Sequence, residues 1–358
     1  MRVKLHELQE GCILSTDIFS RTNRPIFSRK TVLTASLIEV LKAFMIYEVE
    51  VEKTLINGAR FIPSTYESDE LEEKEENSQL SFTDLFLQSV SQYKKEFTSW
   101  QSGLPIDMTK IRALLLPLLE KVENNPSEVF NLHRFSTTDT YPFQHPVAVG
   151  LISGYIGKKL DLEKGEWIQL ALAGCLADCG MAKINPRVLH KKTALTIREY
   201  EDVKNHPIHS YKMVQNTPVL RKDAKIAILQ HHERLDGSGY PLKSRKVHQY
   251  ARIIAIADTF HAMTSERLYR NKQSPFKALE MILEDSFGKF DINIVTSICS
   301  TIINFTPGDR IKLSNGQIAE VLFVDRKAPT RPLIKILSTD EIIQLERNRQ
   351  LYIDEILS

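Results

Sequence analysis

Residues 230–242 read QHHERLDGSGYPL, and this stretch is the most informative in the chain. It places two adjacent histidines, His231 and His232, ahead of a glycine-rich turn. Adjacent side chains on a helix point in different directions, so the two imidazoles are expected to meet different neighbours. Their role therefore depends on which other acids and histidines lie close to them in the fold.

Further histidines and aspartates lie in segments with helical periodicity. His145 opens the apolar segment HPVAVGLISGYIGKKL, and His206 follows a polar segment. Asp178 in LALAGCLADCG and Asp258 in RIIAIADTFHAM have mainly apolar neighbours, which predicts that both carboxylates are buried. A buried carboxylate needs hydrogen bonds, a charged partner or a metal ion. Imidazole and carboxylate ligands together suit Fe, Mn, Zn or Ni, and two such ions can activate a water and hold a phosphoryl group.

A single histidine or aspartate in a helix is more often structural than a metal ligand, because isolated motif matches have high false-positive rates. The interpretation as a metal site therefore rests on the joint pattern of the candidate residues. Five other histidines are interpreted as ordinary surface or core residues: His133, His190, His209, His248 and His261.

The bulk properties of the chain argue against several classes of protein. Its 358 residues predict two or three domains, and its formal net charge of +2 argues against binding to nucleic acid polymers. Four dispersed cysteines, at positions 12, 175, 179 and 299, are typical of a reducing compartment. The N-terminus lacks the apolar core of a signal peptide, and no stretch has the apolar length of a membrane span. We therefore expect a cytoplasmic protein without a membrane segment.

Changes of pattern along the chain predict five segments. Residues 1–60 read as a small α+β module, whose helix has Thr34 or Ser36 as its N-cap, and 61–80 read as an acidic linker. Helical periodicity marks a connector at 81–130, in which Pro117 should kink or interrupt the second helix, and continues through 131–305. Residues 306–358 alternate around Asn315-Gly316, which predicts a hairpin in a β-rich appendage.

The string HHERLDGSGYP at 231–241, followed by ARIIAIADTFHAMTSERLYR at 251–270, resembles the HD-GYP branch of the HD-domain metal-dependent phosphohydrolases. The resemblance covers roughly residues 130–305. It implies a mainly α fold, in which an HD-domain helical bundle lies between the small α+β N-terminal module and the small β-rich C-terminal appendage. Many members of this branch hydrolyse cyclic di-GMP, so the implied substrate is cyclic di-GMP or a related nucleotide.

The resemblance also assigns roles to individual side chains. It implies two divalent transition-metal ions, Fe or Mn, and the implied ligands are His145, Asp178, His206, His231, His232 and Asp258. Asp178 would bridge the ions and act with Asp258 in catalysis. Tyr240 of the Gly-Tyr-Pro signature would contact substrate. Arg267 and Arg270, three residues apart on one helix face, would hold its phosphates.

The chain departs from the family pattern at the motif that gives the HD domain its name. Ala177 stands in place of the motif's histidine, and Met181 in place of its lysine, which contacts the substrate phosphate or the attacking water. Tyr141 replaces an acid found in three-metal members, which argues against a third ion. Removing one transition-state contact costs about 10²–10³ in rate elsewhere, so these losses predict weak or absent activity.

Three functions stay open on this basis. The first is an active cyclic di-GMP phosphodiesterase. The second is a catalytically inactive module that binds a cyclic dinucleotide, or binds proteins through the surface around the Gly-Tyr-Pro turn, with a homodimer as one form. The third is hydrolysis of a different phosphoester. A thiolate of Cys175 could replace the missing imidazole, whereas Cys179 points about 100° away from Asp178, and small buried cysteines are usually core residues.

Overall fold

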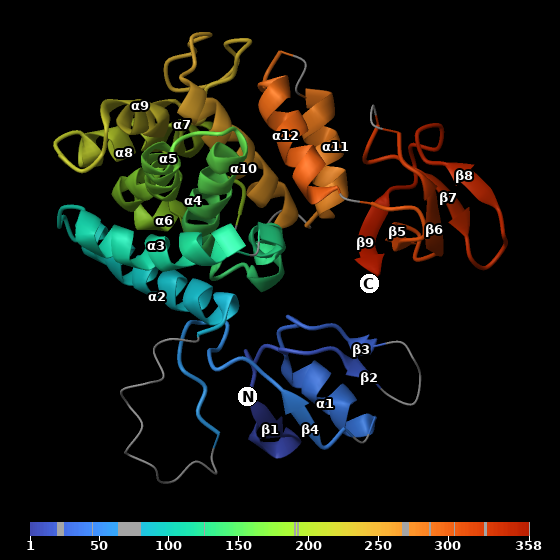
Figure 1. The fold of residues 1–358 in the computed structure, drawn as a ribbon. Coiled ribbons are helices and arrows are strands. Elements are labelled where there is room, and N and C mark those ends of the chain that lie inside the picture. The colour runs from blue at the N-terminus through green and yellow to red at the C-terminus, as the bar shows by residue number, and fades with distance from the viewer. Residues whose placement is uncertain are drawn as a thin grey trace. The chain divides into compact units, whose positions relative to one another are not determined.

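The computed structural model of the protein describes residues 1–19, 25–44, 46–63, 80–124, 126–189, 191, 193–266, 272–285, 288–303, 305–325 and 328–357. It divides into two compact units, Met1–Val147 and Ala148–Ser358 (Figure 1). Most of the predicted acidic linker lies outside the described residues, so its interpretation stays a prediction, as do the five predicted segment limits.

The first unit begins with a small α+β module. Its elements are β1 (Arg2–Lys4), η1 (Leu5–Glu7), β2 (Ile18–Phe19), β3 (Pro25–Phe27), α1 (Ala35–Ala43) and β4 (Glu48–Glu50). β1 pairs with β4 and β2 with β3, both antiparallel. The Thr34 side chain accepts a hydrogen bond from Leu37 N, which confirms Thr34 as the N-cap of α1. Val3, Leu33 and Val49 belong to the core of the module.

Helices make up the rest of this unit. They are α2 (Phe82–Gln101), α3 (Met108–Asn124), η3 (Pro126–Phe135) and the first turns of α4 (Tyr141–Lys159). α3 continues through Pro117, so the prediction that this residue interrupts the helix is wrong. Leu114, Leu115 and Leu118 are buried on either side of it, and their packing offsets the hydrogen bond that proline cannot donate.

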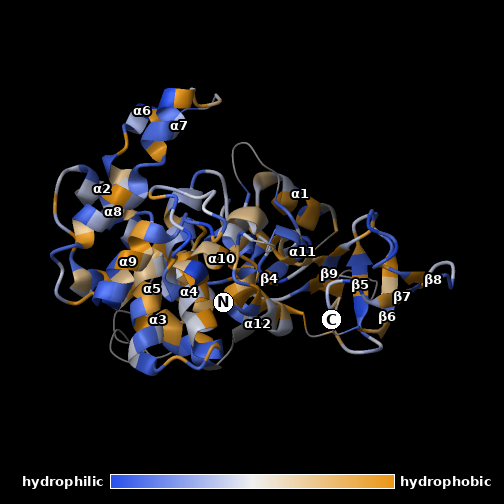
Figure 2. Ribbon diagram, turned by 90° about the horizontal axis from the view of Figure 1, so that it is seen from above, coloured by the Kyte–Doolittle hydropathy of each residue, from blue (hydrophilic) through white to orange (hydrophobic). Residues whose placement is uncertain are grey.

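The second unit contains a helical bundle formed by the remainder of α4 and the helices that follow. These are α5 (Lys164–Leu176), η4 (Cys179–Lys183), α6 (Pro186–Leu189), α7 (Ile197–Val203), α8 (His206–Val214), α9 (Lys222–Gln230), α10 (Gln249–Thr264), α11 (Pro275–Asp285) and α12 (Ile292–Ile302). Hydrophobic residues are frequent along α4, α5 and α10 (Figure 2), and α5 and α10 bury most of their side chains. None of the described helices has the length and apolar character needed to span a membrane.

A five-stranded antiparallel sheet completes the second unit, as predicted for the C-terminal appendage. Its strands are β5 (Arg310–Leu313), β6 (Ile318–Phe323), β7 (Leu333–Ile336), β8 (Ile342–Gln344) and β9 (Ile353–Leu357), in the order β8-β7-β6-β5-β9. The predicted hairpin at Asn315-Gly316 joins β5 to β6 and is confirmed. Arg331 is buried beside Glu280 of α11 and also donates hydrogen bonds to the Leu345 and Leu351 carbonyls, which fixes the sheet to this helix.

Candidate metal centre

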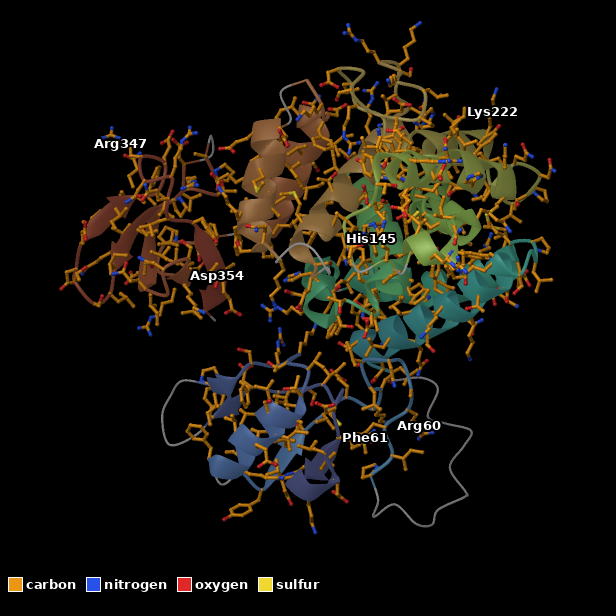
Figure 3. The ribbon with its side chains drawn as sticks, turned by 180° about the vertical axis from the view of Figure 1, so that it is seen from behind. Arg60, Phe61, His145, Lys222, Arg347 and Asp354 are labelled. Atoms are coloured by element: carbon orange, nitrogen blue, oxygen red, sulfur yellow. The ribbon has the colours of Figure 1, made fainter. Side chains whose placement is uncertain are left out.

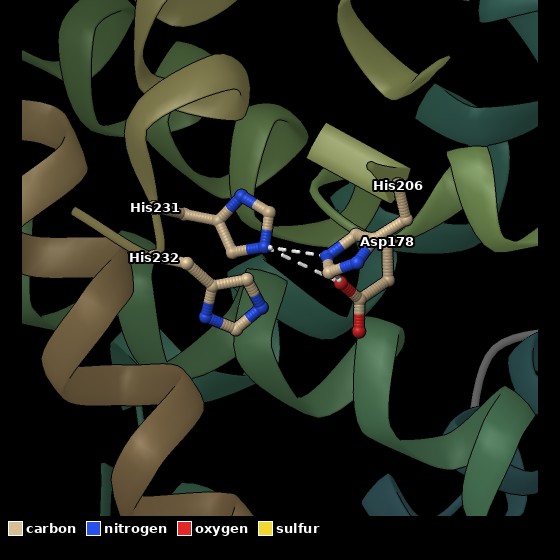
Figure 4. Close-up of side chains that lie close together, drawn as sticks. All are labelled: Asp178, His206, His231 and His232. Carbon is tan, nitrogen blue, oxygen red and sulfur yellow. Dashed lines mark hydrogen bonds and ion pairs between the residues drawn. The ribbon is translucent and has the colours of Figure 1, made fainter. Parts of the chain in front are cut away.

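Four predicted ligands meet in the second unit: Asp178, His206, His231 and His232 (Figure 4). Each offers one ligand atom, and these atoms lie within 4.8 Å of one another. The residues come from distant parts of the chain, since Asp178 precedes η4, His206 begins α8, and the two adjacent histidines follow α9. The structure therefore brings together four of the six side chains predicted to bind metal.

Asp178 does not lie inside an apolar helix, as its sequence neighbours suggested. α5 ends at Leu176, and Asp178 occupies the turn before η4 with a quarter of its side chain exposed. Ser210 of α8 fixes this turn, because its hydroxyl donates to Ala177 O at 2.6 Å and accepts from Gly180 N at 2.7 Å. A side chain at Gly180 would collide with the backbone at His206 and Ser210, so glycine is needed for this close approach.

Two imidazoles present equivalent atoms to the Asp178 carboxylate. His206 Nδ1 lies 2.8 Å from Val203 O and His231 Nδ1 lies 2.7 Å from Ile228 O, which places a proton on each Nδ1. Both Nε2 atoms then carry lone pairs, and they lie 3.1 and 3.4 Å from Asp178 Oδ1. Hydrogen bonds to backbone carbonyls of this kind also orient histidines that bind metals.

Three electron-rich atoms thus converge, because the two Nε2 atoms are also only 3.2 Å apart. Such an arrangement is repulsive unless a cation or shared protons lie between the atoms. Nitrogen and carboxylate oxygen ligands suit a divalent transition metal, and the site residues therefore fit such an ion. The geometry does not select one metal among those ions.

Asp178 and His206 shift each other's pKa through their hydrogen bond and their charges. Burial alone would raise the pKa of Asp178, but hydrogen bonds and charge interactions with His206 and His231 hold this pKa well below its usual value. Burial is the largest effect on His206 and lowers its pKa, but the hydrogen bond and the charge of Asp178, with smaller contributions from Val203 and Asp258, together leave the pKa raised. The carboxylate and imidazole therefore stabilise each other as a charged pair.

His232 faces a different neighbour from His231, as expected for adjacent side chains. Its Nδ1 lies 3.7 Å from Asp258 Oδ2, and its ring centroid lies 4.6 Å from that of Tyr240. Burial, and next the charge of His231, lower its pKa well below the usual value, so the neutral imidazole is favoured. Asp258 thus lies beside the cluster, in contact with His232.

Glu233 holds the Gly-Tyr-Pro turn against these histidines. Its side chain is buried, and its two carboxylate oxygens accept hydrogen bonds from Leu242 N at 2.5 Å and Ser244 N at 2.9 Å. Gly239 passes so close to the backbone at His232 and Glu233 that a Cβ atom there would lie 2.4–2.5 Å from it. These contacts place the Tyr240 ring on His232.

The remaining predicted residues have different outcomes. His145 is buried in α4 and stacks on Tyr141 at 5.0 Å, but it belongs to the first unit, so its role as a ligand stays a prediction (Figure 3). Arg267 and Arg270 lie outside the described residues, and their predicted phosphate contacts stay untested. Ala177 is buried where α5 ends and offers no donor atom to the cluster.

The cysteines near the cluster are poor substitutes for the missing imidazole. Cys175 and Cys179 are both buried. Burial raises the pKa of the Cys175 thiol far above its usual value and raises that of Cys179 to about 12. Both thiols are therefore protonated at neutral pH, whereas a metal ligand needs the thiolate.

Ser210 and Glu233 were not recognised from the sequence as part of the site. Serine has too many ordinary roles to be informative, and the contacts of Ser210 join positions about 30 residues apart. Glu233 directly follows the paired histidines, and this adjacency was an available signal.

Comparison with known proteins agrees with the fold. Residues 123–294 match the family described as the HD domain. A solved HDG"Y"P protein from Bdellovibrio bacteriovorus superposes with a TM-score of 0.50 at 13% identity, covering 84% of this chain and 99% of that one, which supports the fold alone. The helical architecture and this match show similarity to the HD domain and a mainly α fold.

Curated relatives are similar to part of the chain. A cyclic di-GMP phosphodiesterase of Pseudomonas aeruginosa is 27% identical over 242 residues, which is 67% of this chain and 58% of the relative. A cyclic di-GMP phosphodiesterase of Thermotoga maritima is 35% identical over 163 residues, 43% of this chain and 44% of the relative. A 3'3'-cGAMP-specific phosphodiesterase of Vibrio cholerae is 33% identical over 160 residues, 43% of this chain and 36% of the relative.

The chain is thus similar to the HD domain and to these phosphodiesterases, and it carries the Gly-Tyr-Pro signature with Ala177-Asp178 at the position of the His-Asp pair. It spans between 36% and 58% of the length of the relatives just described.

Proposed function

We propose that the protein is a metal-dependent phosphodiesterase that acts on cyclic di-GMP or a related cyclic dinucleotide. The observation that carries this proposal is the convergence of Asp178 Oδ1 with the Nε2 atoms of His206 and His231. Backbone contacts of the two Nδ1 atoms orient the Nε2 atoms toward the carboxylate, and this arrangement supports cation binding. The names of the relatives support the substrate class.

Two divalent ions, Fe or Mn, would be held by the predicted ligands. Asp178, His206, His231 and His232 would hold them, and the resemblance adds His145 and Asp258 to the implied ligands. The set lacks the imidazole that Ala177 replaces. A bound ion of this kind lowers the pKa of a coordinated water and stabilises negative charge on a phosphoryl oxygen.

The chain's own residues orient and enclose these ligands. Ser210 holds the turn that carries Asp178, and Glu233 holds the turn that carries Tyr240. Tyr240 covers one face of His232 and limits the access of water to that side. Arg267 and Arg270 would bind the phosphates of the substrate.

A catalytically inactive cyclic-dinucleotide-binding or protein-interaction module is the second candidate, and Ala177 favours it. The buried alanine removes one nitrogen donor, and Met181 removes a cation. Loss of one such transition-state contact costs about 10²–10³ in rate, so the turnover we propose is slow.

Metal content and turnover measured together test this proposal. Protein purified without chelator should contain close to two divalent ions per chain and should hydrolyse cyclic di-GMP in Mn²⁺ or Fe²⁺. Asp178→Asn should abolish both, whereas Asp223→Asn, which changes an exposed carboxylate beside His248, should retain both. Wild-type protein with fewer than two ions and no turnover would refute the enzymatic proposal.

The double substitution Ala177→His and Met181→Lys then separates the two candidates. It restores the side chains that the family pattern implies at both positions. If the wild-type protein is a slow enzyme, the double variant should hydrolyse cyclic di-GMP roughly 100-fold faster, because it regains a transition-state contact of that value. If the double variant binds two ions and still shows no turnover, the inactive binding module is the better description.

A further inference from the structure

An aromatic and cationic surface lies next to the metal cluster, and two of its residues, Tyr200 and Lys204, have no function described above. Lys204 Nζ lies 4.9 Å from the centroid of the Tyr200 ring and 5.8 Å from that of the Tyr240 ring. Tyr240 in turn contacts His232 through its ring, at 4.6 Å between centroids. Tyr200, Lys204 and Tyr240 therefore extend outward from a predicted metal ligand.

The backbone fixes this group firmly to the cluster. Tyr200 and Lys204 are four residues apart at the end of α7, so they share one helix face. The carbonyl of Val203, the residue before Lys204, accepts the hydrogen bond from His206 Nδ1. A capping box between Thr196 and Glu199 begins the helix. The positions of Tyr200 and Lys204 are thus tied to that of a ligand histidine.

The exposure of these side chains suits ligand binding. Tyr200 is 52% exposed, which is a large apolar ring left open to solvent beside a polar cluster. Lys204 forms an ion pair with Glu201 at 2.8 Å, with side-chain exposures of 29% and 60%. Exposed pairs three residues apart contribute little to stability, so a phosphate can replace Glu201 as the partner of the ammonium group at small cost.

We propose that Tyr200, Lys204 and Tyr240 form a substrate-binding wall, and this proposal rests on the function proposed above. In this wall, Lys204 pairs with a phosphodiester oxygen and Tyr200 stacks on a nucleobase. Cyclic dinucleotides present both chemical groups in one molecule. Aromatic rings bind bases through their flat faces, and a lysine ammonium group binds phosphate as a point charge. The wall therefore recognises the dinucleotide rather than a simple phosphoester.

Equilibrium binding provides a readout that does not depend on turnover. We would measure the fluorescence anisotropy of labelled cyclic di-GMP with Mn²⁺-loaded protein and, separately, with protein treated with EDTA. Lys204→Gln should weaken binding roughly 10- to 100-fold, the value of a charge-assisted contact, and Lys204→Arg should restore most of it. Tyr200→Ala should weaken binding by roughly 5- to 100-fold, and Tyr200→Phe should bind as wild type.

Matched controls use residues of the same type elsewhere. Lys222 is an exposed lysine on α9 at the edge of the helical bundle, and Tyr47 is a 76% exposed tyrosine in the N-terminal module (Figure 3). Lys222→Gln and Tyr47→Ala should leave the dissociation constant within twofold of wild type. The Lys204 effect should shrink as salt rises, whereas the Tyr200 effect should not.

The outcomes separate the two proposals. If wild-type protein binds cyclic di-GMP and the Lys204→Gln and Tyr200→Ala variants bind equally well, the wall is refuted while the proposed function stands. If only those two variants lose affinity, the wall is supported, whether or not turnover is detected. If the wild type neither binds nor hydrolyses cyclic di-GMP, the proposed function fails and the wall fails with it.

Discussion

Replacing Glu233 by glutamine should release the Gly-Tyr-Pro turn from the metal cluster. The buried carboxylate of Glu233 accepts one hydrogen bond on each oxygen, from Leu242 N and Ser244 N. Glutamine keeps the shape of the side chain but offers only one acceptor, and its amide group would face the second backbone N–H. Hydrogen bonds to charged groups contribute about 1.5–3 kcal/mol each. The loss of one bond and the weakening of the other should therefore cost about 2–4 kcal/mol locally.

Hydrogen exchange measures this local cost directly, since both donors are backbone amides. A loss of 2 kcal/mol corresponds to about a 30-fold drop in protection. Leu242 and Ser244 should exchange at least that much faster in Glu233→Gln, whereas amides in β6 should be unchanged. Asp236→Asn is the matched control, because Asp236 is exposed and its Oδ1 atom, which accepts from Ser238 N, is retained in asparagine. Unchanged protection of both amides in Glu233→Gln would refute the anchoring role.

Three further predictions concern the cluster, α7 and the appendage. Ser210→Ala should weaken Mn²⁺ binding roughly 10- to 100-fold in a titration, as other outer-shell losses do, whereas Ser300→Ala should not. The hydrogen bond from Lys191 lowers the pKa of Glu199 to about 2. The ion pair between these residues therefore stabilises the fold fully above about pH 4.5, and this stabilisation is lost as the pH falls toward 2. Hydrogen exchange corrected for intrinsic rates should show α7 losing protection over that range, and Glu199→Gln should show no such dependence. Arg331→Met removes the buried guanidinium group from Glu280, whose carboxylate keeps only Lys277 at 3.3 Å, and should cost about 3 kcal/mol, exposing β7 and β8 to proteolysis, whereas Arg347→Ala should not.

Much of the fold could be predicted from local sequence patterns. Helical periodicity indicated the bundle, the Asn-Gly pair indicated the β5–β6 hairpin, and Thr34 was one of two proposed N-caps. Each of these signals depends on a few neighbouring residues, whose intrinsic structural preference agrees with the packing around them. Of the two outcomes predicted for Pro117, an interruption does not occur, because buried neighbours hold α3 together against the local preference of proline, and a kink stays a prediction.

The site was predictable in its composition but not in its geometry. The spacing of histidines and aspartates identified the four residues that meet, and the divergence of His231 and His232 followed from helix geometry. The turn that carries Asp178 was not predicted, because it depends on Ser210, which lies more than 30 residues away in the sequence. Tertiary contacts of this kind leave no local pattern.

The polar contacts around the cluster bear on whether metal binding survives the replacement of the motif's histidine by Ala177. Burying imidazoles beside a carboxylate costs free energy, and well-packed apolar residues of similar volume are often equally or more stabilising. The chain nevertheless keeps His206 and His231 buried, with both Nδ1 atoms held by backbone carbonyls and both Nε2 atoms directed at one carboxylate oxygen. A purely structural role requires none of this orientation. This geometry suits cation binding, so under our proposal the substitution at Ala177 removes one donor from a site whose other predicted ligands keep an arrangement that fits an ion.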